Sequence, residues 1–414
     1  NAHRRLLPTL IIGFATPIIL WRGSFLQDFV STESNGLATT LMIATGLGGM
    51  LLLAIIWGKF PLPEIWGVFS ALGLVWLGVS FWLNENQESS RTVLLICFSA
   101  VFSTVLAFFL PESRNNTLLW GPSIALSLLV LLLSLSQGAN SEGAFGFSGS
   151  IAFGHLMTLA FLITYLVSLE SKRLSNLYFS TSVVFMAGLL LSSSRGAILG
   201  LIAGTALALV KAGSLFGAKK VVAETKRLGL LLFLLLPPFF LPAPELPVGA
   251  MPVVATDTLG DTRSGLQRAL IETFSLSEES EQVQIPFYTS GRLTIWTSTL
   301  DLVDESNAWL FGLGQSKVLV EQKKTYPHNI FLELLLGGGL VAATPFAFFL
   351  LYLALQIRRV GIGRGFEFFP LAGASTVFAL LSGDLFYNIA LAWFLGLAYG
   401  SVLRAHERGV YFSH

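Results

Sequence analysis

The chain has 414 residues, of which 53% are hydrophobic and 12% are charged, and its mean hydropathy is +0.72. This composition is typical of a polytopic membrane protein and excludes an ordinary water-soluble domain. The formal net charge is +1 and the sequence shows no basic face of the kind that binds nucleic acid, so we expect no nucleic-acid partner.

Apolar segments long enough to cross a bilayer recur along the chain. We expect an all-α fold of about twelve transmembrane helices, since one crossing takes roughly 20 apolar residues. The predicted spans lie near Leu6–Trp21, Ala38–Trp57, Glu64–Leu83, Val93–Leu110, Leu118–Leu135, Ser150–Leu169, Leu177–Leu191, Ala197–Val210, Leu228–Leu241, Gly339–Ile357, Phe368–Ser382 and Tyr387–Leu403. The first is expected to be a retained helix and not a cleaved signal peptide, because it has no small-residue cleavage site and further spans follow it.

Basic residues are concentrated in every second connection between the spans. One set of connections carries most of them, including the run from Lys211 to Arg227, whereas the short connections of the other set carry only Arg22, Arg91 and Arg195. The positive-inside rule then predicts that both termini are cytoplasmic. The predicted parts are spans one to nine in residues 1–240, a large periplasmic loop with short helices in residues 241–327, and a short periplasmic helix with spans ten to twelve in residues 328–414.

The large loop carries Gly291-Arg292-Leu293-Thr294-Ile295-Trp296 near its end. Ser290 is suited to cap a helix there. Its apolar residues would follow three-four-three spacing and are Leu293, Trp296, Leu300 and Val303. Arg292 falls in the first turn, where the helix dipole disfavours a cation, so an anion from elsewhere would offset that cost. Simple packing on the surface of the bundle is the alternative role for Trp296.

A second short helix is predicted at Tyr326-Pro327-His328-Asn329. Proline suits a first helical position, and Gly337-Gly338-Gly339 would end the helix before the next span. His328 then lies in the first turn, where the dipole disfavours an imidazolium, so we expect a neutral side chain near pH 7. A neutral imidazole at a membrane surface can act as a general base. A capping or interfacial role is the alternative for His328.

A third feature is the turn Ser192-Ser193-Ser194-Arg195-Gly196, which is predicted to face outward between the seventh and eighth spans. An arginine so close to hydrocarbon needs a partner or water, or else it extends to lipid headgroups. His155 is a weaker candidate, since a lone histidine on an apolar helix is usually packed and hydrogen-bonded. The five histidines are scattered and the single Cys97 lies inside a span, so we expect neither a metal site nor an intramolecular disulfide.

Arg195, Arg292 and His328 are thus all predicted at the outer surface of the membrane. Arginine binds phosphate through a planar fork, and a diphosphate attached to a long lipid would place its charge at this depth. If a sugar were linked to that diphosphate, the arginines would stabilise the leaving group where other enzymes use a metal. His328 would accept the proton of an incoming hydroxyl.

The chain resembles the O-antigen ligase and polymerase superfamily of bacterial envelope glycosyltransferases. Three features, in this order, carry the resemblance between Ser150 and Leu403. They are Ser194-Arg195-Gly196-Ala197; Gly291-Arg292-Leu293-Thr294-Ile295-Trp296 followed by Phe311-Gly312-Leu313-Gly314; and His328-Asn329-Ile330-Phe331-Leu332-Glu333 followed by Gly337-Gly338.

The resemblance implies an inverting, metal-independent transferase of the bacterial inner membrane, with no cofactor and with its active site facing the periplasm. Its donor would be a glycan on undecaprenyl diphosphate, and its acceptor lipid A–core or another lipid-linked glycan. Arg195 and Arg292 match the family's diphosphate-binding arginines, and His328 matches its proposed base. Further candidates are Asn329, His155 and Asp384.

Several functions stay open at this point. A single large outer loop favours a ligase, which transfers the finished glycan to lipid A–core, over a polymerase, which transfers it to another lipid-linked unit. A transporter, for example of bicarbonate, should place charges deep inside spans or break helices at mid-membrane, and the sequence has almost no mid-span charge. A non-catalytic scaffold would leave the outward positions of Arg195, Arg292 and His328 unexplained.

Overall fold

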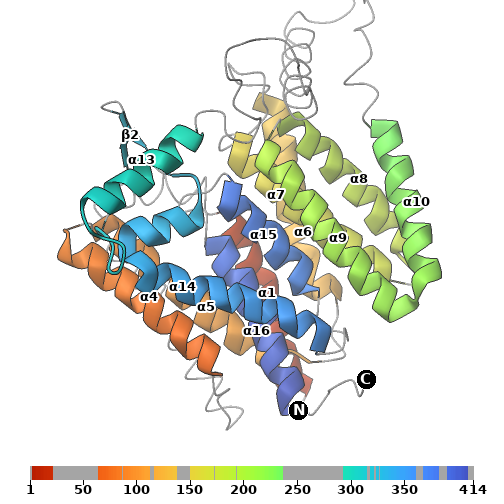
Figure 1. Cartoon of the computed structure of the whole chain (residues 1–414). Helices are drawn as coiled ribbons and strands as arrows, with labels where there is room; N and C mark the ends of the chain where they lie inside the picture. The colour runs from red at the N-terminus through yellow and green to blue at the C-terminus, as the bar shows by residue number, and fades with distance from the viewer. Residues whose placement is uncertain are drawn as a thin grey trace, which may run out of the picture. The chain divides into compact units, whose positions relative to one another are not determined.

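The computed structural model describes thirteen stretches of the chain. They are residues 2–21, 64–85, 87–111, 116–137, 150–171, 173–192, 194–235, 292–314, 318–320, 323–325, 327–359, 367–381 and 389–408. Within them the chain forms twelve helices and one pair of short strands (Figure 1). Strands β1 (Val318–Val320) and β2 (Lys323–Thr325) pair antiparallel, with Leu319 opposite Lys324. The described part is therefore helical apart from this hairpin.

Eight of the described helices are long and apolar enough to cross a membrane, which supports a multi-pass membrane protein. These candidate spans are Ile65–Leu83, Thr92–Phe109, Leu118–Ser136, Ile151–Glu170, Ser175–Ser192, Gly196–Gly213, Ile330–Gln356 and Ile389–Glu407. Two shorter apolar helices, Leu6–Leu20 and Phe368–Leu381, coincide with the first and eleventh predicted spans. The ninth overlaps α10 (Ala218–Leu235), which is too highly charged to be among the eight. The predicted span Ala38–Trp57 lies outside the described residues, so the total of twelve stays a prediction.

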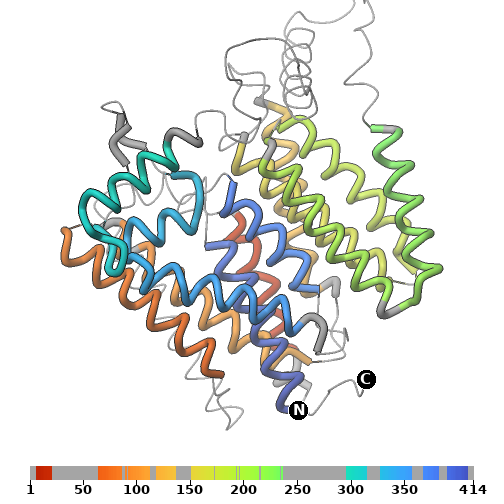
Figure 2. Tube along the Cα trace, in the orientation of Figure 1, coloured from red at the N-terminus to blue at the C-terminus, as the bar shows by residue number. Residues whose placement is uncertain are grey.

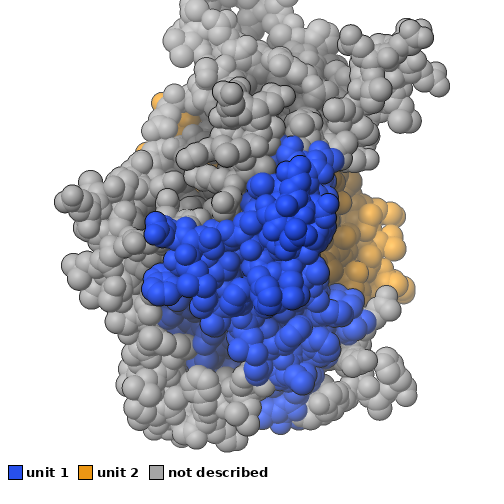
Figure 3. Space-filling view, turned by 60° about the vertical axis from the view of Figure 1, so that its left-hand side comes forward, with its two compact units in different colours: residues 1–119, 291–414 blue, residues 120–290 orange. Residues whose placement is uncertain are grey.

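The chain divides into two compact units (Figure 3). Residues 1–119 and 291–414 form the first unit, and residues 120–290 form the second. The first contains α1 (Ala2–Trp21), α4 (Ile65–Leu83), α5 (Gln87–Phe109), α13 (Arg292–Glu305), α14 (Ile330–Arg359), α15 (Phe368–Leu381) and α16 (Ile389–Glu407). The second contains most of α6 (Asn116–Gln137), together with α7 (Ser150–Glu170), α8 (Ser175–Ser192), α9 (Arg195–Phe216) and α10.

The centre of the first unit is α16, which is almost entirely buried and packs along α5. Two small residues one helical turn apart allow this close approach. A Cβ atom at Gly396 would lie 2.0 Å from the Ser103 hydroxyl, and one at Gly400 would lie 2.1 Å from the carbonyl oxygen of Thr104. The indole of Trp393 also donates a 3.1 Å hydrogen bond to the Thr16 hydroxyl, which joins α1 to α16.

A polar cluster lies at the start of α4. The Glu64 carboxylate contacts both Tyr352 on α14 and His406 on α16. The second ring nitrogen of His406 lies 3.2 Å from the Gln356 side-chain oxygen, and the Glu64 amide donates a 2.9 Å hydrogen bond to the Tyr399 hydroxyl. The start of α4 is thereby joined to two helices that are distant in sequence.

The second unit is built around α7, whose apolar length is buried by α8 and α9. Polar pairs join α7 to α9 near both ends. The Lys211 ammonium lies 2.6 Å from the Glu170 carboxylate, and the Thr158 hydroxyl donates a 3.1 Å hydrogen bond to the carbonyl oxygen of Ala197. The bond to Ala197 holds the first turn of α9 on α7, and this turn carries Arg195.

Candidate functional site

Helix α13 begins at Arg292, which therefore lies in its first turn, as predicted. Of the residues on this helix, Thr299 and Val303 are fully buried, whereas Leu300 is 37% exposed. Val303 packs with Ala308 against Leu335 and Leu336 of α14. The apolar spacing predicted the helix but does not show which edge of the apolar stripe meets a neighbour.

Trp296 joins α13 to the segment that carries His328. Its indole Nε1–H donates a 2.8 Å hydrogen bond to the carbonyl oxygen of Pro327, the residue directly before His328. Trp296 also lies four residues after Arg292, so both positions share one face of α13. The structure therefore brings the start of α13 beside the His328 segment, within one compact unit.

His328 lies outside helix α14 and not in its first turn. The helix begins at Ile330, and the Asn329 side chain caps it by accepting hydrogen bonds from the amides of Phe331 (2.9 Å) and Leu332 (3.3 Å). Proline at a first helical position was the wrong signal, because the stronger capping group is the asparagine two residues later. The argument that the dipole keeps His328 neutral is correspondingly weaker.

The backbone of His328 is in the left-handed region, with φ of 53°. That conformation costs a residue with a Cβ atom about 1–2 kcal/mol, so a histidine is retained there against a conformational penalty. The side chain is half-buried, and its Nδ1 atom is shielded from solvent. The accessible part of the ring therefore excludes Nδ1.

Asn329 has a structural role that accounts for its side chain. Besides capping α14, its Nδ2 donates a 3.3 Å hydrogen bond to the carbonyl oxygen of Leu380 at the end of α15. Both ends of the carboxamide are thus used to hold the start of α14. Glu333, in the first turn of the same helix, is 1% exposed, and a carboxylate at this position is favoured by the helix dipole.

Helix α14 changes direction along its length (Figure 2), and the break lies at Gly339, between a short N-terminal piece and a long apolar piece. Gly339 has φ of 65° and ψ of −161°, a conformation that is essentially restricted to glycine. The break frees backbone groups that an intact helix would pair internally. Inside a membrane protein such groups need other partners. The prediction that the glycine run ends the short helix is therefore confirmed at Gly339.

The Phe311-Gly312-Leu313-Gly314 motif and the residues around it supply those partners. The amides of Leu313 and Gly314 donate to the carbonyls of Leu336 (2.7 Å) and Gly337 (3.0 Å). In the reverse direction, the amides of Leu340 and Val341 donate to the carbonyls of Trp309 (2.8 Å) and Leu310 (3.2 Å). The two glycine motifs of the sequence are thus a single backbone-paired structure.

Helix α4 adds further hydrogen bonds to this paired structure, although no motif in its sequence predicted them. The Ser80 hydroxyl donates a 2.7 Å hydrogen bond to the Gly337 carbonyl, and the Trp76 indole donates to the carbonyls of Gly338 (3.1 Å) and Phe311 (3.3 Å). A serine and a tryptophan one turn apart on an apolar helix were the available signal. They have no distinguishing pattern within α4, and only the fold shows their partners.

The Arg195 turn lies in the second unit, on the surface of α7. Its Ser194 is the residue before α9, and Arg195 is the first residue of that helix. A Cβ atom at Gly154 of α7 would lie 2.7 Å from both the Ser192 hydroxyl and the Ser194 Cβ, so a glycine is needed for this contact. His155 is buried beside Gly154, at the end of α7 that supports the turn.

The two candidate arginines share one structural feature: each is the first residue of a helix, α9 for Arg195 and α13 for Arg292. Because a cation is disfavoured at a helix N-terminus, both positions favour a bound anion. Arg292 and His328 belong to the first unit and Arg195 to the second, so the convergence of all three stays a prediction. Asp384 lies outside the described residues. Among the described residues, no group of three or more His, Cys, Asp or Glu side chains is placed to hold a metal ion.

Together these features define a multi-pass helical membrane protein in which a histidine and two helix-initiating arginines lie at the ends of helices. Residues 180–347 match the family model described as O-antigen ligase. The matched segment contains Arg195, Arg292, His328 and Asn329, and it confirms the resemblance that the motifs predicted. The match over this segment supports the O-antigen ligase superfamily. No curated protein matches the chain.

Proposed function

We propose that the chain is a glycosyltransferase of the O-antigen ligase type, which moves a glycan from undecaprenyl diphosphate to a hydroxyl of lipid A–core at the periplasmic face of the inner membrane. The hydrogen bond from Trp296 to the Pro327 carbonyl is the observation that carries this proposal. It joins the helix that starts with Arg292 to the segment that presents His328, and so it supports one site with an anion-binding group and a base.

In the proposed reaction, His328 accepts the proton of the acceptor hydroxyl as its oxygen attacks the anomeric carbon of the donor sugar. The bond between that carbon and the diphosphate oxygen breaks with inversion, and undecaprenyl diphosphate leaves with the electron pair. Arg195 and Arg292 stabilise the charge on the departing diphosphate. General-base catalysis of this kind contributes roughly 10²–10⁴ in rate.

The position of the break in α14 favours an enzyme over a transporter. Residues 340–359 continue the helix after the break, and at 1.5 Å per residue they extend about 30 Å, the thickness of the hydrocarbon core. This part is long enough to cross the membrane by itself, which would put the break near one membrane surface. A transporter would be expected to interrupt its helices near the middle of the membrane.

The test is a transfer assay with purified protein in lipid nanodiscs. The protein receives an undecaprenyl-diphosphate glycan, with lipid A–core present or absent and no added metal. We expect glycan on lipid A–core from the parent chain, and a rate lower by roughly 10²–10⁴ for His328→Ala. A ladder of longer glycans on the donor alone would identify a polymerase instead. Failure of transfer under both conditions would overturn the proposal.

A further inference from the structure

Helix α10 (Ala218–Leu235) combines a charged half and an apolar half. Its charged half contains four cations, Lys219, Lys220, Lys226 and Arg227, and one carboxylate, Glu224. No charged residue occurs from Leu228 to the end of the helix. Two of the four cations form ion pairs with Glu224, and the other two do not.

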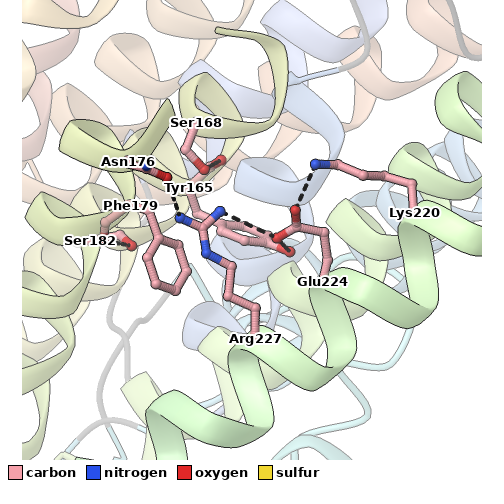
Figure 4. A network of polar contacts seen from close by, with 8 residues as sticks. All are labelled: Tyr165, Ser168, Asn176, Phe179, Ser182, Lys220, Glu224 and Arg227. Carbon is pink, nitrogen blue, oxygen red and sulfur yellow. Dashed lines mark hydrogen bonds and ion pairs between the residues drawn. The ribbon is translucent and has the colours of Figure 1, made fainter. Parts of the chain in front are cut away.

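Glu224 turns one face of α10 toward the interior of the second unit (Figure 4). Its side chain is 4% exposed. One carboxylate oxygen lies 2.8 Å from the Lys220 ammonium, and the other lies 3.9 Å from the Arg227 guanidinium. The Tyr165 hydroxyl of α7 donates to this second oxygen at 3.5 Å. Lys220, Glu224 and Arg227 thus occupy one face, at helical spacing of four and three.

Arg227 strengthens this orientation of α10 through contacts with α8. Its guanidinium lies 3.4 Å from the centre of the Phe179 ring and donates a 3.4 Å hydrogen bond to the Asn176 side-chain oxygen (Figure 4). A cation over an aromatic face and an ion pair to a buried carboxylate both favour the same geometry. The rotation of α10 about its own axis is therefore set by contacts to two other helices.

Lys219 and Lys226 lie on a different face. They are seven residues apart, so they align along the helix, roughly a third of a turn away from the Glu224 face. Both side chains are exposed. Within the part of the chain that the structure describes, the ion pairs of α10 involve Lys220 and Arg227 and leave these two lysines without a carboxylate.

The same exposed face becomes apolar directly after Lys226. Leu230 follows four residues later and is 58% exposed, and Phe233 follows three residues after that and is 72% exposed. A face that changes from lysine to leucine and phenylalanine within one turn matches the boundary between lipid headgroups and hydrocarbon. Lys226 and Phe233 are about 10 Å apart along the axis, which fits a helix entering the bilayer at this level.

We propose that Lys219 and Lys226 form a binding site for the headgroup of an anionic phospholipid, in the leaflet where α10 enters the membrane. Lysine binds phosphate as a point charge, and lysines close to an anionic surface contribute attraction that falls off within a Debye length. The neighbouring Leu230 and Phe233 would contact the acyl chains of the same lipid. Lipid binding at these two lysines does not depend on the proposed transfer reaction.

The test measures lipid binding to the purified protein by native mass spectrometry. Phosphatidylglycerol and phosphatidylcholine with identical acyl chains are titrated separately. We expect the parent chain to prefer phosphatidylglycerol, and Lys226→Gln to reduce that preference about fivefold, since one lysine near an anionic surface contributes about 1 kcal/mol. The double variant K219Q/K226Q should lose most of the preference, and K219R/K226R should keep it.

Lys220→Gln is the matched control, because it removes the same charge from the inner face of the same helix. It should keep the preference for phosphatidylglycerol within twofold and lower the thermal midpoint, since Glu224 loses a partner. Lys226→Gln should instead reduce the preference for phosphatidylglycerol and leave the thermal midpoint unchanged. Equal loss of preference in the two variants, or no preference in the parent chain, would overturn the proposal.

Discussion

The indole nitrogen of Trp296 and the carbonyl oxygen of Pro327 form a 2.8 Å hydrogen bond between residues that are 31 positions apart. One partner lies one helical turn after Arg292, and the other directly precedes His328. A carbonyl held in this way limits the rotation of the peptide group that leads into His328. The bond therefore couples the position of the proposed base to the helix that begins with the proposed diphosphate ligand.

Trp296→Phe removes the donor and keeps an aromatic ring. We expect kcat to fall roughly 10- to 100-fold with a smaller change in KM, because small displacements of a catalytic group cost up to about 100-fold in rate. The measurement is the steady-state rate of glycan transfer. Trp309→Phe is the control, since its indole donates to Asp304 at 2.9 Å on the exposed side of the same region. Equal effects of both substitutions would contradict a specific role for Trp296.

His328 permits a test that separates catalysis from folding. At φ of 53°, glycine avoids a conformational cost of about 1 kcal/mol that alanine retains. We therefore expect His328→Gly to unfold at higher denaturant than His328→Ala, with the transfer rate lowered roughly 10²–10⁴-fold in both. Unfolding in detergent and transfer in nanodiscs are measured on the same preparations. A transfer rate close to that of the parent chain in either variant would exclude His328 as the base.

Asn329 is expected to act through the helix and not on the substrate. Asn329→Ala removes the cap of α14 and should lower the free energy of unfolding by about 1 kcal/mol. Asn329→Asp keeps a capping oxygen and adds a charge that the helix dipole favours, so it should restore most of the stability. The free energies come from denaturant titration and the activities from the transfer assay. Stable but inactive Asn329→Asp would instead indicate direct contact with a substrate.

Gly339 is expected to tolerate no side chain. A Cβ atom there would lie 2.3 Å from the Leu310 carbonyl oxygen, in addition to the cost of the backbone conformation. Gly217 isolates the second effect, because it has φ of 80° and ψ of 169° and a Cβ atom would meet nothing within 4 Å. We expect Gly217→Ala to cost about 1–3 kcal/mol and Gly339→Ala more. Thermal unfolding of both variants checks the order, and a milder effect at Gly339 would contradict it.

Arg195 and Arg292 belong to different compact units, and a double-mutant cycle tests whether they bind one diphosphate. Each arginine-to-lysine exchange keeps the charge and removes the bidentate fork, so each should raise KM for the donor. If both contact the same group, the double variant should deviate from additivity by about 0.5–3 kcal/mol. Additive effects would place the arginines in separate roles. The acceptor KM serves as the internal control, because it should change less than the donor KM.

Local patterns in the sequence were enough to predict several elements. Hydropathy predicted a multi-pass helical protein because each span must satisfy its backbone internally and expose apolar side chains to lipid. The start of α13 at Arg292 and the break after the glycine run also follow from local signals, since helix ends depend on neighbouring residues. Three ordered motifs predicted the family, and the match over residues 180–347 agrees with them.

Other features depend on contacts between distant residues, and only the tertiary structure decided them. The choice of Thr299 over Leu300 as a buried residue depends on where α14 lies. The start of α14 at Ile330 depends on the Asn329 side chain, which caps the helix and is held in place by the distant carbonyl of Leu380. The pairing of residues 309–314 with 336–341, and the bond from Trp296 to Pro327, join backbone groups that no periodicity relates. Sequence alone determined which residue types stand at the helix ends, because that is a local property of the chain, whereas the fold decided which of those ends meet.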